Sequence, residues 1–107
     1  MLKGDVVIVA IQGDYGKPRP AVIFQSNKIV TDSILLIPIT SHLIENSKIR
    51  PTIQPSQSNG LQVTSQLMTD KMQAIKKEKV GKIIGKLEPD EIKEIEHALM
   101  IFFDLSN

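Results

Sequence analysis

The chain has 107 residues, which suits one compact domain covering residues 1–107. Apolar residues make up 41% of the sequence and aromatic residues only 4%, which predicts a core built from Ile, Leu and Val. No cysteine is present, so disulfides are excluded and a reducing compartment, the cytoplasm, is expected. The two histidines, His42 and His97, stand far apart without ligand-spaced carboxylates, so we expect no metal site and no cofactor.

The net charge of +1 conceals an uneven distribution. Residues 1–86 hold twelve Lys or Arg against six Asp or Glu, a net +6, whereas residues 87–107 hold one against six, a net −5. A basic body of this kind is able to bind a polyanion, although a solvated surface explains the same charges. The apolar run near the N-terminus, Val6–Ile11, is too short to span a membrane.

Five or six short segments are predicted to be strands, because each is apolar or alternating and is bounded by turn-forming residues. In chain order they are Val6–Ile11, Ala21–Gln25, Ser33–Thr40, Thr52–Gln54, the stretch from Leu61 through Gln66–Met68 to Ile75, and Val80–Leu87. The first is apolar at every position, as in a strand covered on both faces. Pro38 in the third predicts an edge or a bulge. Two polar turns are expected at Ser26–Asp32 and Pro55–Gly60.

One helix follows the strands. Five apolar residues recur at helical spacing on one face: Ile92, Ile95, Leu99, Phe102 and Phe103. Pro89 suits the first helical position. We expect this stripe to pack in the core or in a dimer. Short strands followed by one terminal helix predict a mainly β fold, a small SH3-like barrel.

Several local motifs occur in a fixed order over nearly the whole chain. They are Gly4-Asp5-Val6-Val7, Arg19-Pro20-Ala21-Val22-Ile23, Pro38-Ile39-Thr40-Ser41, Leu67-Met68-Thr69-Asp70-Lys71-Met72-Gln73-Ala74-Ile75 and Ile84-Gly85-Lys86-Leu87. Each is weak alone, but the ordered series resembles the MazF/PemK (Kid) toxins. The segment after Asp70 departs from that family, which commonly has Gln-x-Arg there, and the loop at residues 12–18 is shorter than usual.

The resemblance implies an SH3-like barrel of the MazF/PemK/CcdB type that acts as a homodimer. It implies the toxin of a type II toxin–antitoxin system, an endoribonuclease that cuts single-stranded RNA at short motifs and is inhibited by a cognate antitoxin. Arg19 and Thr40 match the family's catalytic arginine and threonine. Residues predicted to contact the RNA are Lys17, Tyr15, Ser41, His42, Asp70 and Gln73.

A guanidinium and a hydroxyl suit RNA cleavage without a metal. The 2′-hydroxyl of RNA is itself the nucleophile, so the protein has to hold the geometry and stabilise the phosphoryl charge. Arg19 offers a planar fork to phosphate, and Thr40 offers one more hydrogen bond.

Structural roles remain open for the same residues. Arg19 could pair with Asp14, and Thr40 could bond a backbone group at the strand end. Asp70 either contacts RNA or anchors a loop. His42 either takes part in the reaction or is an exposed loop residue. Five lysines form either a solvated face or phosphate contacts: Lys76, Lys77, Lys79, Lys82 and Lys86.

Two other functions compete with the ribonuclease. A CcdB-like toxin shares the fold, binds DNA gyrase and cuts nothing, but such a binder does not need Arg19 with Thr40. An SH3-like peptide-binding module relies on an aromatic groove, and one Tyr without Trp disfavours it.

Overall fold

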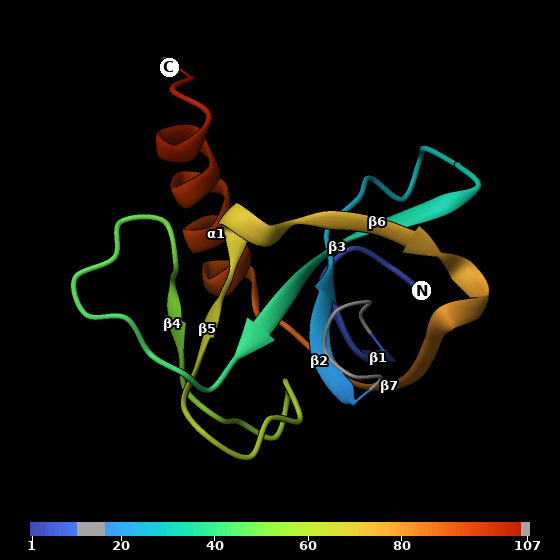
Figure 1. Ribbon diagram of the computed structural model, residues 1–107, viewed down its shortest axis with the longest axis horizontal. Helices are drawn as coiled ribbons and strands as arrows, with labels where there is room; N and C mark the ends of the chain where they lie inside the picture. The colour runs from blue at the N-terminus through green and yellow to red at the C-terminus, as the bar shows by residue number, and fades with distance from the viewer. Residues whose placement is uncertain (11–16, 106–107) are drawn as a thin grey trace.

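The computed structural model describes residues 1–10 and 17–105, and Figure 1 shows a strongly curled sheet with one helix beside it. The strands within these residues are β1 (Asp5–Ala10), β2 (Pro18–Ile23), β3 (Ser33–Thr40), β4 (Thr52–Ile53), β5 (Ser65–Leu67), β6 (Gln73–Lys76) and β7 (Val80–Lys86). The short 3-10 helices η1 (Thr69–Lys71) and η2 (Lys77–Lys79) flank β6. The helix α1 (Pro89–Phe102) follows β7.

The sheet runs in the order β4-β5-β3-β2-β1-β7, with antiparallel neighbours. β3 pairs with β2 along one edge, and with β6 and then β5 along the other. Register shifts between β1 and β7 mark irregularities that increase the local twist. The result is a curled half-barrel, which confirms the predicted mainly β fold with a C-terminal helix.

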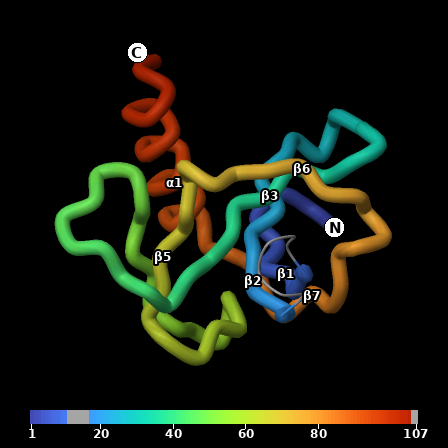
Figure 2. Tube along the Cα trace, viewed as in Figure 1, coloured from blue at the N-terminus to red at the C-terminus, as the bar shows by residue number. Residues whose placement is uncertain are grey.

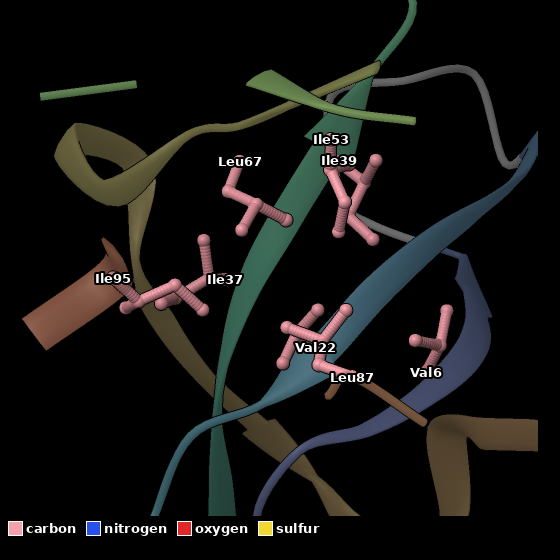
Figure 3. Close-up of a cluster of buried hydrophobic side chains, with 8 residues drawn as sticks. All are labelled: Val6, Val22, Ile37, Ile39, Ile53, Leu67, Leu87 and Ile95. Atoms are coloured by element: carbon pink, nitrogen blue, oxygen red, sulfur yellow. The ribbon is translucent and has the colours of Figure 1, made fainter. Parts of the chain in front are cut away.

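Both faces of the central strands are covered by apolar side chains. On β1, Val6 belongs to one buried cluster and Val7 to a second, because successive side chains point to opposite faces. Figure 3 shows the first cluster, in which Ile95 of α1 lies beside Ile37 of β3. This two-sided burial explains why β1 is apolar at every position from Val6 to Ala10.

The helix begins and packs as its sequence predicts. Pro89 is its first residue, and the Glu88 backbone N–H donates to the Glu91 carboxylate at 2.7 Å, which caps the start. The residues that pack on the core are Ile92, Ile95 and Leu99. Phe102 and Phe103 are 43% and 51% exposed in the single chain, so a core role is wrong for this end of the stripe.

Three strand predictions need correction. The predicted stretch from Leu61 to Ile75 contains two short strands, β5 and β6, separated by η1. β2 begins at Pro18, three residues before the predicted Ala21, because this earlier stretch already pairs with β1. An edge position for Pro38 is wrong, since β3 is an interior strand. Pro38 lies where β3 changes partner, after Leu36 opposite β6 and before Ile39 opposite β5. A residue without an N–H fits this gap in the ladder.

The predicted turn at Pro55–Gly60 packs against β7. Asn59 is fully buried, and its Oδ1 accepts two backbone N–H groups of the turn, at 3.0 and 2.9 Å. Gly60 has a φ of +71°, and a Cβ there would lie 2.1 Å from the carbonyl oxygen of Ile84. Glycine is therefore required at this position. The turn leads residues 61–63 to the rim of the site described next.

Candidate active site

The two residues predicted to be catalytic lie at the same end of neighbouring strands. Arg19 is the second residue of β2, and Thr40 is the last residue of β3. The antiparallel register pairs Ala21 with Pro38, and continuing it by two residues sets Arg19 opposite Thr40. Arg19 is exposed and Thr40 is half-buried. A charged fork and a hydroxyl therefore stand on adjoining strands where the sheet meets solvent.

A cavity of about 360 Å³ opens beside Arg19. Ser41, which directly follows Thr40, lines the same cavity, so two predicted site residues share this space. The other lining residues are mostly apolar: Ile8, Pro20, Ile39, Gly60, Leu61, Gln62, Val63, Ser65 and Ile84. The volume lies within the range of ligand pockets, about 300–1,000 Å³.

The Thr40 hydroxyl has a backbone partner. Its Oγ1 accepts the backbone N–H of His42 at 3.0 Å, which is the structural role that the sequence left open for it. Accepting this bond does not use the hydroxyl's own proton, so Thr40 is still able to donate. The His42 side chain itself is exposed.

Asp70 is paired with Arg50. The Arg50 Nε and Nη2 each donate to one Asp70 carboxylate oxygen at 2.8 Å, and the side chains are 11% and 27% exposed. This hydrogen bonding lowers the pKa of the Asp70 carboxyl and raises the pKa of the Arg50 guanidinium, against the opposing effect of burial. Of the two roles left open for Asp70, anchoring a loop is the one that this ion pair displays.

The remaining predicted RNA contacts are spread along the sheet. Lys17 is exposed immediately before β2, and Gln73 is the first residue of β6. Gln73 pairs with Leu36, four residues before Thr40 on β3, which is about 13 Å along a strand. Gln73 therefore does not share one reacting centre with Thr40. Tyr15 lies outside the described residues.

Sequence reasoning missed the side chains that hold the loop at residues 41–51, drawn in green in Figure 2. Gln66 bonds the backbone of Ile44, and the Thr69 hydroxyl donates to the carbonyl of Ile49. Gln66 stands in β5, whose sequence Ser-Gln-Leu gives no clear signal of this role. Its partner lies 22 residues earlier, so no local pattern identifies the contact.

Metal-ligating side chains do not gather in the described part of the chain, where no three His, Asp or Glu residues are grouped to hold an ion. Residues 1–10 and 17–105 also contain no helix that is long and apolar enough to cross a membrane. A reaction without metal or cofactor stays a prediction, which chelation is able to test.

Residues 2–103 match the family described as PemK-like, MazF-like toxin of type II toxin-antitoxin system. The chain belongs to this PemK/MazF family. Membership confirms the family that the ordered motifs predicted. It also confirms endoribonuclease as the class of enzyme, because MazF-family toxins are endoribonucleases.

This PemK/MazF toxin is similar to its relatives over nearly its whole length. The probable endoribonuclease MazF of Mycolicibacterium smegmatis is 30% identical over 108 residues, 99% of each chain. The Mycobacterium tuberculosis toxin MazF-mt6 is 22% identical with a TM-score of 0.82, covering 96% of this chain and 99% of that one. An endoribonuclease in complex with its cognate antitoxin, from a Mycobacterial species, is 20% identical with a TM-score of 0.83, covering 100% and 98%. These solved structures share the fold.

Proposed function

We propose that this toxin cuts single-stranded RNA at short sequence motifs, through attack of a 2′-hydroxyl on the adjacent phosphorus. The observation that carries the proposal is the register of β2 and β3, with Arg19 and Thr40 at one end of the sheet beside a cavity that Ser41 also lines. A guanidinium and a hydroxyl in this arrangement suit a phosphate that gains negative charge during a reaction.

The reaction needs no nucleophile from the protein. A bond forms between the 2′-oxygen and phosphorus as the bond from phosphorus to the 5′-oxygen breaks, which gives a 2′,3′-cyclic phosphate and a 5′-hydroxyl. One proton leaves the 2′-hydroxyl and one is added to the 5′-oxygen. The protein has to hold the in-line geometry and stabilise the developing charge.

Each proposed catalytic residue has one task. The Arg19 fork donates to two phosphoryl oxygens and stabilises their charge; it does not transfer a proton, because arginine stays protonated. Thr40 donates its hydroxyl hydrogen to the same phosphate, while the His42 N–H fixes its oxygen. His42 itself, exposed two residues later, is assigned to substrate binding together with Ser41 and Lys17.

Positive charge on the body supports a polyanionic substrate. Lysines are concentrated on β6, η2 and β7, and all but Lys77 are exposed: Lys76, Lys77, Lys79, Lys82 and Lys86. Contacts from lysine to phosphate add affinity without sequence preference. Sequence selection must then come from groups near the reacting phosphate, such as the cavity beside Arg19.

The proposal includes two partners. One is a second copy of the chain, supported by apolar side chains that are exposed at the end of α1: Ile101, Phe102, Phe103 and Leu105. The other is a cognate antitoxin, since structural relatives were solved as an endoribonuclease with its cognate antitoxin and as MazE-MazF from Deinococcus radiodurans. An acidic antitoxin segment over Arg19 would compete with RNA for the same charge.

Cleavage in the presence of EDTA tests the proposal directly. Purified protein should cut a single-stranded RNA that contains many short motifs and leave 2′,3′-cyclic phosphate ends. DNA of the same sequence should survive, because it lacks the 2′-hydroxyl. End-group analysis of the products and parallel incubation with the DNA oligonucleotide measure both.

The same assay separates the competing functions. A CcdB-like gyrase binder or a peptide-binding module would leave RNA intact under every condition. A strict requirement for Mg²⁺, or equal cutting of DNA, would contradict attack by the 2′-hydroxyl in a site built from Arg19 and Thr40.

A further inference from the structure

The loop between β3 and β4, residues 41–51, is fastened to the segment β5–η1 by side chains. We call it the anchored loop. It begins one residue after Thr40, and its first residue, Ser41, lines the cavity that Arg19 also lines. The conformation of this loop therefore determines part of the surface beside the proposed reacting phosphate.

Gln66 fastens the middle of the anchored loop. The residue is 4% exposed; its side-chain oxygen accepts the Ile44 N–H and its side-chain NH2 donates to the Ile44 carbonyl, both at 2.9 Å. A second bond from Nε2 reaches the Thr52 hydroxyl at 3.2 Å. The buried amide therefore bonds both backbone groups of Ile44, as a neighbouring strand would, and fixes the backbone there.

Arg50 and Asp70 fasten the far end of the loop. The two parallel bonds at 2.8 Å form a bidentate fork, a geometry that defines the direction of both side chains. The Ser47 hydroxyl also accepts the Arg50 N–H at 3.1 Å, so backbone and side chain of this residue are both held. Both oxygens of Asp70 accept from Arg50, so the Asp70 charge is spent on holding Arg50 and the pair has no net charge to offer a phosphate.

On either side of the Ile44 fastening the loop presents a continuous run of exposed residues. The exposed residues are His42, Leu43, Ile44, Glu45 and Asn46. A fixed backbone with exposed apolar and polar side chains binds a ligand at a smaller loss of conformational entropy than a free loop. Such a surface is suited to discriminate among bases adjacent to the cleaved bond.

We propose that Asp70 is a positioning residue, which clamps Arg50 and thereby holds the anchored loop in the conformation that selects the RNA sequence to be cut. This inference rests on the proposed function, because selection requires that the chain cleaves RNA. It assigns Asp70 an indirect role in place of a direct RNA contact, and it gives Arg50 and Gln66 roles in specificity.

The first test measures the protein without RNA. In Asp70→Asn and in Arg50→Met, amide hydrogen exchange over residues 42–50 should become at least tenfold faster than in the native chain. The matched control is Lys3→Met, which removes the exposed Lys3–Glu96 ion pair of 3.6 Å elsewhere on the surface. Exchange in the loop that stays at the native rate in both clamp variants would overturn the proposal.

The second test is a double-mutant cycle on selectivity. Selectivity is the ratio of kcat/KM for the preferred RNA sequence to kcat/KM for a single-base variant. It should fall about tenfold in Asp70→Asn and in Arg50→Met, because KM for the preferred RNA rises while kcat stays the same. The double variant should lose no more than either single variant, since both break one clamp. Additive losses would mean that Asp70 acts on RNA independently of Arg50 and would overturn the proposal, as would unchanged selectivity.

The two proposals fail in different ways. A native chain that leaves RNA intact would overturn the proposed function and the selecting role together. A native chain that cuts RNA, with clamp variants equally selective, would overturn only the role assigned to Asp70. Gln66→Leu provides an independent variant, because it frees Ile44 while leaving the ion pair in place; it should also reduce selectivity.

Discussion

A guanidinium differs most from an ammonium where two atoms of one phosphate have to be held at once. Arg19→Ala is expected to slow RNA cleavage on the order of a hundred- to a thousand-fold, because a fixed donor to the charged phosphoryl group is lost. Arg19→Lys should be nearly as slow, since a point charge does not reproduce the fork. Initial rates on a short RNA with one cleavage site measure both, and circular dichroism checks that each variant is folded.

Two substitutions of Thr40 test the role of its hydroxyl. Thr40→Ser keeps the Oγ that accepts the His42 N–H, whereas Thr40→Ala removes it. Activity should therefore survive largely in the serine variant and fall in the alanine variant. Equal losses in the two variants, or a fully active Arg19→Ala, would show that the proposed site is wrong.

The loop between β3 and β4 depends on pH through the Arg50–Asp70 ion pair. Arg50 lowers the pKa of Asp70 in the folded chain, so the ionised pair stabilises the fold above the ordinary Asp pKa. Asp70→Asn should lower the free energy of unfolding by about 2 kcal/mol at neutral pH. Below pH of about 4 the difference should shrink, and it should disappear once the pH passes below the lowered folded pKa. Urea unfolding of both proteins at several pH values measures it.

Lys3→Met is the control for this pH series. The Lys3–Glu96 pair is more exposed and longer, so its removal should change the free energy of unfolding by less than about 1 kcal/mol. A difference between native chain and Asp70→Asn that grows as the pH falls would contradict the stabilising role of the ionised pair.

At the scale of the whole molecule, the apolar end of α1 favours a two-fold dimer. Phe102 and Phe103 are 43% and 51% exposed, and their ring centroids lie 5.4 Å apart. The two rings therefore form one apolar surface that a second copy is able to cover. Light scattering should give about twice the single-chain mass of 11.9 kDa. Phe103→Asp should give the mass of one chain, because it sets a charge in that contact.

The control for the dimer is Lys79→Asp, which changes charge on η2 rather than at the helix end. It should leave the mass at that of a dimer. A native chain that scatters as a single copy while cutting RNA at full rate would contradict the dimer.

Local sequence determined the elements, because the signals that form them are local. A β-branched run predicted β1, the spacing of Ile92, Ile95 and Leu99 predicted α1, and the cluster Pro55–Gly60 predicted a turn. The family resemblance pointed to Arg19 and Thr40 through the motifs at the start of β2 and the end of β3. That prediction needed no tertiary structure, since both motifs are continuous in the chain.

Only the tertiary structure decided how distant residues meet. The pairing of β2 with β3 brings Arg19 and Thr40 to one end of the sheet, and the pairing of β3 with β5 brings Gln66 to the loop that follows Thr40. Arg50 and Asp70 lie 20 residues apart, and a chain with thirteen basic and twelve acidic residues allows many other ion pairs. Opposite charges attract whichever partners come close, so packing decides which ion pairs form. The alternation of side chains that forms a strand is already present in the sequence.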